Sequence, residues 1–221
     1  MARVSGVSAN WARGHPWAAV YDFFVEREAL SRPAGQLLFG TDTRLLYDGM
    51  QAVDEVPDGG AILDIPCGGG VALRAVRPEH DFHYVAADIA PAMLERTEQV
   101  ARSRGLGSVV ETAKEDVEGL SFEDDSFDLV LSFAGLHCFP HPDVACREIA
   151  RVLRPGGSFV GSVFLTDGGI RYQPMVTFGR LAGVMGPSGG RADLERWLRD
   201  AGLGDVDIER SGAIAYFRAR R

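Results

Sequence analysis

The chain has 221 residues, 46% of them hydrophobic and 24% charged, a composition typical of a globular protein with one sizeable core. Its formal net charge of −8 argues against a nucleic-acid partner, because binding a phosphate backbone needs a basic face. Its three cysteines, Cys67, Cys138 and Cys146, contain no CxxC pair, which excludes a disulfide framework and a zinc site of the usual spacing. There is no apolar run of about 18 residues to span a membrane and no signal-peptide core, so we expect a cytoplasmic protein without a metal.

The N-terminal quarter is predicted to be helical. Residues 1–15 are expected to form a loose arm, and Pro16 opens a helix that Pro33 interrupts. A second helical pattern runs from Leu37 to Met50. We expect residues 1–57 to form this arm and a helical cap, and residues 58–221 to form one folded domain.

Strands and helices alternate after the turn at residues 57–60. Alternation at this spacing predicts a parallel sheet with helices on both faces. Residues 166–190 are glycine-rich and are expected to form a loop and helix beside a pocket. The last two strands are predicted to pair as a hairpin, which gives a seven-stranded, Rossmann-like α/β sheet with one antiparallel strand. The expected strands are 61–65, 82–88, 108–113, 127–133, 158–164, 205–209 and 213–219, and the expected helices after residue 60 begin near 71, 91, 142 and 192.

The segment AILDIPCGGG, residues 61–70, is predicted to bind a cofactor. An apolar strand enters three glycines there, and a helix is expected to start at Val71. Glycine lets the backbone turn tightly beside a ligand, and a helix N-terminus offers free N–H groups. Asp88 ends the next strand and is suitably placed for ribose hydroxyls. These features alone fit either a nicotinamide dinucleotide or S-adenosylmethionine.

Four motifs occur in the same order as in one known protein family, and they narrow the choice between these two cofactors. DIPCGGG at 64–70 resembles the glycine signature of class I S-adenosylmethionine-dependent methyltransferases, and ADIAPAMLERT at 87–97 resembles the segment that follows it. Residues 114–139 and REIARVLRPGGSFVGS at 147–162 resemble that family's third and fourth motifs. The branch most similar to the chain includes the ubiquinone and menaquinone biosynthesis methyltransferases. Pro66 departs from the pattern, since the family has glycine there.

The resemblance implies a role for each matching residue toward S-adenosylmethionine. Asp64 orders the glycine loop or reaches the methionine amino group, and these two roles stay open. Met93 belongs either to the core or to the adenine site, and Cys67 either packs within the loop or presents a thiolate. The implied cofactor residues are Asp64, Cys67, Gly68 and Gly70 in the loop, Asp88 at the ribose, Ile89, Met93, Asp116 and Val117 at the adenine, and Ser132 and Phe133 below the methyl group.

His137 is the candidate catalytic base, because it follows the fourth strand at the expected pocket rim. Packing or a loop hydrogen bond is the alternative role for this side chain. His15 and Tyr21 are candidates for a lid over the cofactor. A pocket wall of Phe23, Phe24, Tyr172, Met175, Phe178 and Met185 favours a small apolar or aromatic methyl acceptor.

Two other functions remain open from the sequence. One is a cofactor-binding protein that transfers no methyl group, and the other is a nicotinamide-dependent oxidoreductase. The sequence leaves open whether the protein is a monomer or a homodimer.

Overall fold

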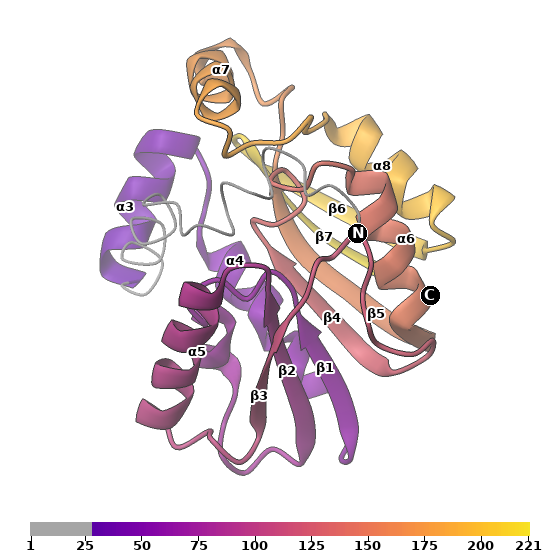
Figure 1. The fold of residues 1–221 in the computed structure, drawn as a ribbon. Coiled ribbons are helices and arrows are strands. Elements are labelled where there is room, and N and C mark those ends of the chain that lie inside the picture. The colour runs from indigo at the N-terminus through magenta and orange to yellow at the C-terminus, as the bar shows by residue number, and fades with distance from the viewer. Residues whose placement is uncertain (1–27) are drawn as a thin grey trace.

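A computed structural model describes residues 28–221, with side chains from Ser31 onward. The helices and strands follow one another along this part of the chain in the alternating order that the sequence predicts (Figure 1). Their bounds are α3 (Glu28–Phe39), α4 (Arg44–Met50), η1 (Gln51–Glu55), β1 (Gly60–Asp64), η2 (Val71–Ala75), β2 (Phe82–Asp88), α5 (Pro91–Ser103), β3 (Val110–Lys114), β4 (Phe127–Phe133), α6 (Pro142–Val152), β5 (Leu153–Phe164), η3 (Ile170–Tyr172), α7 (Gln173–Leu181), α8 (Arg191–Asp200), β6 (Gly204–Ser211) and β7 (Ile214–Arg220).

The described residues form a seven-stranded sheet in the order β3-β2-β1-β4-β5-β7-β6. The five strands from β3 to β5 pair in parallel, and β7 pairs antiparallel with both β5 and β6. The predicted fold, with a single antiparallel strand, is confirmed. Strand order reverses between β1 and β4, and a ligand of an open α/β sheet binds beyond the carboxyl ends of the strands at such a point.

Alternate side chains of each strand enter one of two cores. Leu63 of β1 packs with side chains of α6 and α8, whereas its neighbour Ile62 packs with side chains of α4, η1 and α5. Helices therefore cover both faces of the sheet (Figure 1). Because both faces of β1 and β4 are buried, the sequences of these strands are continuous hydrophobic runs without a polar alternation.

Two local predictions are wrong, and a third is confirmed in a shorter form. A helix starts at Val71 after the glycines, as expected, and it is the five-residue 3-10 helix η2. Pro33 lies inside α3 and does not end it. The predicted strand 158–164 starts too late, because α6 ends at Val152 and β5 already begins at Leu153. A register shift between Phe127 and Leu129 accommodates the extra residues of β5.

A third, smaller core supports α7 above the sheet. Phe164 at the end of β5 packs with Tyr172, Val176 and Met185. Phe39 of α3 joins this core and meets Phe164 edge-on, with ring centroids 6.1 Å apart. The segment between β5 and α8 is thus fixed at the carboxyl end of the sheet.

Candidate functional site

The glycine loop turns through backbone conformations that favour glycine. Gly68 has φ +52° and Gly70 has φ +80°, both in the left-handed region. The carbonyl of Gly68 accepts a 2.8 Å hydrogen bond from the Thr97 hydroxyl on α5. A Cβ added to Gly70 would lie 3.2 Å from the same hydroxyl. The loop is therefore held against α5, and a side chain at Gly70 would have to displace Thr97 by a few tenths of an ångström.

Asp88 holds this loop from the neighbouring strand. Its Oδ2 accepts a 3.0 Å hydrogen bond from the Gly68 N–H, and its Oδ1 accepts a 2.9 Å bond from the Ala90 N–H. Burial raises the pKa of Asp88, and the backbone hydrogen bonds partly oppose that shift. A carboxylate has about four acceptor positions, so after these two bonds Asp88 keeps capacity for ligand hydroxyls.

Asp64 is the second buried carboxyl group at this edge of the sheet. Burial raises its pKa to about 7, the Tyr84 hydroxyl opposes that shift with a hydrogen bond, and the charge of Asp88 adds to it. Neither Asp64 nor Asp88 forms an ion pair with a cationic side chain among residues 31–221. Among the described residues, no cation therefore offsets the negative charge that these two carboxyl groups carry when ionised, which favours a cationic ligand.

Ser132 lies beside these groups at the end of β4 and is fully buried. Its hydroxyl is the buried side-chain polar atom that lacks a hydrogen-bond partner within the described chain. An unsatisfied buried hydroxyl is costly, and in native proteins such a group commonly meets a ligand or water. Ala134 follows with φ +57°, an unusual conformation for alanine that is concentrated at functional sites.

These features fit S-adenosylmethionine better than a dinucleotide. S-adenosylmethionine carries a sulfonium and an ammonium group, which suit the buried acids Asp64 and Asp88. The diphosphate of a nicotinamide dinucleotide would meet those acids with like charge. Dinucleotide sites also place the diphosphate at an α-helix N-terminus, whereas this chain has only the short η2 there.

The predicted adenine residues follow β2 and β3, and Met93 lies in the first turn of α5. Asp116 is exposed, and its Oδ1 accepts a 3.1 Å hydrogen bond from the Glu118 N–H. Val117 is buried in the core, while Ile89 and Met93 are half-buried. Their contacts with an adenine stay a prediction.

His137 lies just past β4, as expected. Its Nδ1 accepts a hydrogen bond of 3.3 Å from the Phe164 N–H, which lies beyond the last β4–β5 pair. Burial lowers the pKa of His137 to about 4, so the imidazole is neutral at pH 7. An acceptor at Nδ1 leaves the proton on Nε2. This bond is the loop hydrogen bond that the sequence analysis gives as the alternative role of His137. The role of this side chain in catalysis stays a prediction.

Cys67 and Phe133, two further predicted cofactor residues, contact neighbouring helices. Burial raises the pKa of the Cys67 thiol well above its ordinary value, so a thiolate at this position is disfavoured. Cys67 Sγ lies 3.6 Å from the Thr97 hydroxyl. Phe133 is half-buried, and its ring would lie 3.3 Å from a Cβ on Gly49 of α4.

Only some of the residues predicted to form a pocket wall lie together in the structure. Tyr172, Met175 and Met185 gather around Phe164 in the small core below α7. Phe178 lies on the outer side of α7, so its assignment to the wall is wrong. Phe23, Phe24, His15 and Tyr21 lie outside the described residues, as do residues 1–27 of the predicted cap.

Sequence reasoning missed two residues that hold the site. Tyr84 lies in the predicted strand 82–88 and Thr97 in the helix expected from residue 91, and neither pattern gives its side chain a role in the site. Tyr84 precedes Asp88 by four residues, so both side chains point to the same face of β2. That spacing is the signal that could have placed the Tyr84 hydroxyl near the glycine loop.

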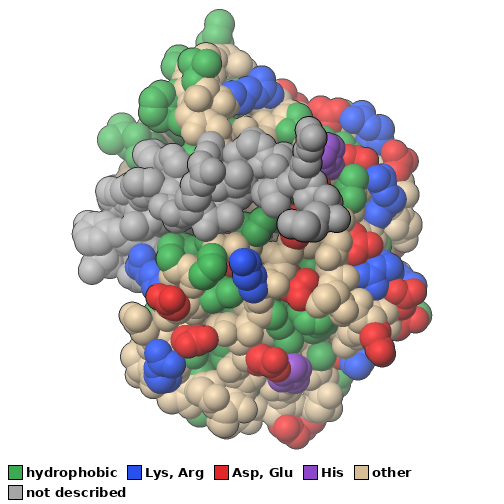
Figure 2. Space-filling view, in the orientation of Figure 1, with side chains coloured by type: hydrophobic (Ala, Val, Ile, Leu, Met, Phe, Trp, Pro, Cys, Tyr) green, Lys and Arg blue, Asp and Glu red, His purple; other side chains and the backbone are tan. Residues whose placement is uncertain are grey.

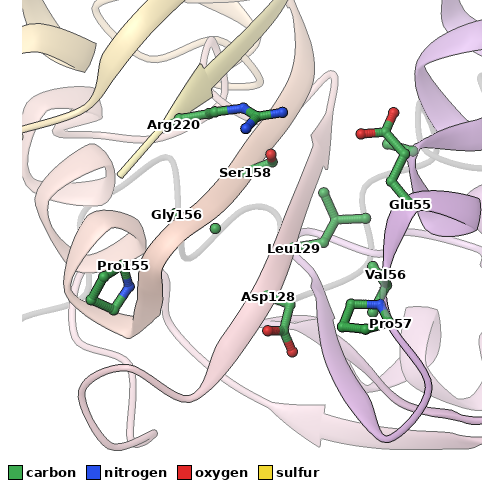
Figure 3. A pocket seen from close by; sticks show the side chains of 11 residues that line it. Glu55, Val56, Pro57, Asp128, Leu129, Pro155, Gly156, Ser158 and Arg220 are labelled. Carbon is green, nitrogen blue, oxygen red and sulfur yellow. The ribbon is translucent and has the colours of Figure 1, made fainter.

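A separate hollow of about 290 Å³ lies at the amino ends of the parallel strands, opposite to the glycine loop (Figure 3). Its lining includes Glu55 after α4, Asp128 at the start of β4 and Arg220 at the end of β7. Asp128 accepts a 2.8 Å hydrogen bond from the Ala61 N–H at the start of β1. These contacts lie at the amino ends of the parallel strands and take no part in the site described above.

Comparison with known families gives one match across the centre of the chain. Residues 63–161 match the family described as methyltransferase domain, and they contain the glycine loop, Asp88, Ser132 and His137. A phthiotriol/phenolphthiotriol dimycocerosates methyltransferase of Mycobacterium tuberculosis is 38% identical over 102 residues, which cover 46% of this chain and 36% of that protein. The match therefore spans less than half of the relative's length.

Solved structures share the fold over most of the chain. A geranyl diphosphate methyltransferase, solved with GPP and sinefungin, gives a TM-score of 0.66 at 15% identity and covers 81% of this chain and 78% of that one. The [4+2]-cyclase SpnF gives 0.64 at 21% identity, covering 78% and 79%. At these identities the likeness shows a common fold alone. Within the described residues, no helix is both long and apolar enough to cross a membrane.

Proposed function

Residues 63–161 belong to the class I, S-adenosylmethionine-dependent methyltransferase family, and from this premise we propose that the chain transfers a methyl group from S-adenosylmethionine to a small apolar or aromatic molecule. The observation that carries the proposal is the pair of buried acids, Asp64 and Asp88, beside a glycine loop and an unsatisfied Ser132 hydroxyl. This group of side chains offers negative charge and one hydroxyl to a cationic ligand.

Each side chain has a proposed task in holding the cofactor. Asp88 accepts the ribose hydroxyls with the capacity left after its two backbone bonds, and Asp64 accepts the methionine ammonium. Ser132 and Phe133 lie below the reacting methyl group. Cys67, Gly68 and Gly70 give the backbone surface, and Ile89, Met93, Asp116 and Val117 surround the adenine.

The bound cofactor supplies an already activated methyl group on a sulfonium. The chain's own contribution is therefore alignment of the acceptor with that methyl group. We assign His137 to this task as a neutral donor, because its Nδ1 is engaged with the Phe164 N–H. Its Nε2–H would hold an acceptor oxygen or nitrogen in position without removing a proton.

The acceptor class is proposed from the side chains next to the carboxyl edge. Tyr172, Met175 and Met185 belong to the apolar core that closes this end of the sheet. The mycobacterial relative is named for methylating phthiotriol and phenolphthiotriol dimycocerosates. Both points favour an apolar acceptor, and a polar amine as the sole substrate would contradict that choice.

Calorimetric titration with S-adenosylhomocysteine, with NADH in parallel, tests the cofactor assignment. We expect binding of S-adenosylhomocysteine that is lost in Asp88→Ala and kept in Asp128→Ala. The control is matched, because Asp128 also accepts a backbone N–H but lies at the opposite edge of the sheet. Binding of NADH alone would overturn the assignment. Tight S-adenosylhomocysteine binding without transfer from labelled S-adenosylmethionine to any apolar acceptor would instead indicate a binding protein.

A further inference from the structure

Helix α7 carries an apolar face that points away from the protein. Ile170, Phe178 and Leu181 are 91%, 66% and 83% exposed, and Pro174 is exposed as well. These four residues, the outer stripe, are spaced by four, four and three positions along the continuous run of η3 and α7, which places them on one face. Figure 2 shows hydrophobic side chains gathered at the end of the molecule where α7 lies.

The opposite face of α7 already fixes the helix to the protein. Val176 and Gly179 are buried, and a Cβ on Gly179 would lie 2.6 Å from Met185 Sδ. The outer stripe is therefore not the packing face of this helix. Large apolar side chains that gather on a surface and lack a partner commonly mark an interaction site.

Arginines flank the outer stripe on both sides. Arg171 and Arg180 are nine positions apart, which on an α-helix is half a turn, with the stripe between them. Arg171 Nη2 donates a 3.0 Å hydrogen bond to the Leu37 carbonyl, and Arg180 Nη2 lies 3.4 Å from the carbonyls of Pro187 and Ser188. These contacts are to backbone oxygens, so neither positive charge is neutralised by a carboxylate of the described residues.

The charge around α7 differs in sign from the rest of the chain. Residues 168–190 contain Arg171 and Arg180 but neither Asp nor Glu, in a chain whose net charge is −8. The flanking Asp167 accepts the Arg191 N–H and lies 3.9 Å from Arg210, so its charge is already paired. At physiological ionic strength, charges farther away than about 8 Å are largely screened. A surface that approaches α7 therefore meets two cations around an apolar stripe.

We propose that the outer stripe docks onto a lipid bilayer that contains anionic headgroups. An interfacial helix has this arrangement, with apolar side chains entering the acyl boundary and basic side chains beside them at the headgroups. Leu37 and Leu38 of α3 are also exposed, and the Arg171 bond to the Leu37 carbonyl brings them next to η3. They extend the apolar surface in that direction.

A second copy of the chain fits this face less well. A symmetric contact through the outer stripes would bring Arg171 and Arg180 of both copies together, and residues 168–190 offer no acid to pair with them. Anionic headgroups supply the missing negative charge. The inference is independent of methyl transfer, because it uses no residue of the cofactor site.

Sedimentation with vesicles tests the proposal directly. The full chain is mixed with vesicles of phosphatidylcholine alone, or of phosphatidylcholine with an equal part of phosphatidylglycerol. We expect binding to the mixed vesicles to be at least about tenfold stronger, which is the effect of two cations near an anionic surface. Replacing both Phe178 and Leu181 by Ser should reduce it by about tenfold or more.

Two further variants separate the charge from the apolar contact. Arg171→Gln with Arg180→Gln should remove the preference for anionic lipid, whereas Arg147→Gln on α6 should not. Thermal unfolding and S-adenosylhomocysteine titration of each variant report whether fold and cofactor site are intact. Absence of vesicle binding by the wild-type chain would overturn the proposal. So would vesicle binding that survives loss of Phe178 and Leu181, or a wild-type dimer that dissociates on that substitution.

Discussion

The phenol of Tyr84 donates a 2.8 Å hydrogen bond to Oδ2 of Asp64, and the two residues are 0% and 2% exposed. This bond opposes the desolvation that raises the pKa of Asp64 to about 7. Tyr84 thus keeps a buried carboxyl group ionisable near neutral pH. The cofactor site depends on that ionisation if Asp64 holds an ammonium group.

Tyr84→Phe should move the pH dependence of cofactor affinity. The affinity for S-adenosylhomocysteine should fall as the pH drops through about 7 in the wild-type chain, because Asp64 becomes protonated. Loss of a hydrogen bond to a charged acceptor should raise that midpoint by about one pH unit. Titrations across pH measure it. Tyr216→Phe, which removes a 2.9 Å bond to Thr41 instead, should leave the midpoint unchanged.

Asp64→Asn should change how stability depends on pH. The ordinary pKa of this carboxyl is 3.8, and in the folded chain it is about 7. Between these values the folded state holds a proton that the unfolded state has released, so the free energy of unfolding falls as pH rises. The full effect is on the order of 4 kcal/mol, and it should disappear in the variant. Urea unfolding of the cofactor-free protein at several pH values measures this.

His137 also makes the free energy of unfolding depend on pH, but in the opposite direction to Asp64. Its pKa falls from 6.5 to about 4 on folding, so unfolding becomes easier as pH drops through this range. His137→Asn should remove this loss of stability at low pH, and its side-chain oxygen can still accept a hydrogen bond from the Phe164 N–H. The same variant should lower methyl transfer while the wild-type rate shows no ionisation near pH 6.5. A wild-type rate that rises with a pKa near 6.5 would show instead that His137 is a base.

Asp88→Asn should weaken both the loop and cofactor binding. An amide has one oxygen, so it cannot accept the Gly68 and Ala90 N–H groups with separate oxygens as the carboxylate does. We expect a loss of about 1–2 kcal/mol in the free energy of unfolding and at least a tenfold loss of S-adenosylhomocysteine affinity. Asp128→Asn is the matched control. Equal affinity loss in both variants would mean that global destabilisation is responsible.

Ala134→Gly and Gly70→Ala should change stability in opposite directions. Both positions have positive φ, +57° and +80°. Glycine at 134 relieves a conformation that costs alanine about 1 kcal/mol, so the urea midpoint should rise slightly. Alanine at 70 adds that strain and places its Cβ against Thr97. A lower midpoint for Ala134→Gly would contradict the assignment of strain to that turn.

Much of the fold follows from patterns that the sequence displays. Apolar runs such as 127–133 and the turn residues that separate them gave the strand count, and the closing hairpin gave the single antiparallel strand. The positions of Asp64, Asp88 and His137 at the carboxyl edge followed from the same alternation, because parallel strands end on one side of the sheet.

The features that the sequence does not predict depend on contacts between particular residues. Val71 to Ala75 has no signal that separates a 3-10 helix from the first turn of an α-helix, and the short link to β2 leaves no room for more. The Tyr84 hydroxyl and the orientation of the His137 ring depend on neighbours that are distant in sequence. The sequence predicts Phe178 in a pocket wall, since large apolar residues are normally buried. On α7 this side chain is exposed instead.

The position of β7 between β5 and β6 sets an order for assembling that edge of the sheet. Among the described strands, β6 pairs with β7 alone, although β6 comes first along the chain. It therefore has no backbone partner until a later segment has aligned with β5. Each mutation that slows alignment of β7 with β5 should leave two strands unpaired at once, and their exposed edges are templates for intermolecular pairing. Aggregation during refolding should thus respond more strongly to changes in β7 than in β3, the strand at the other edge.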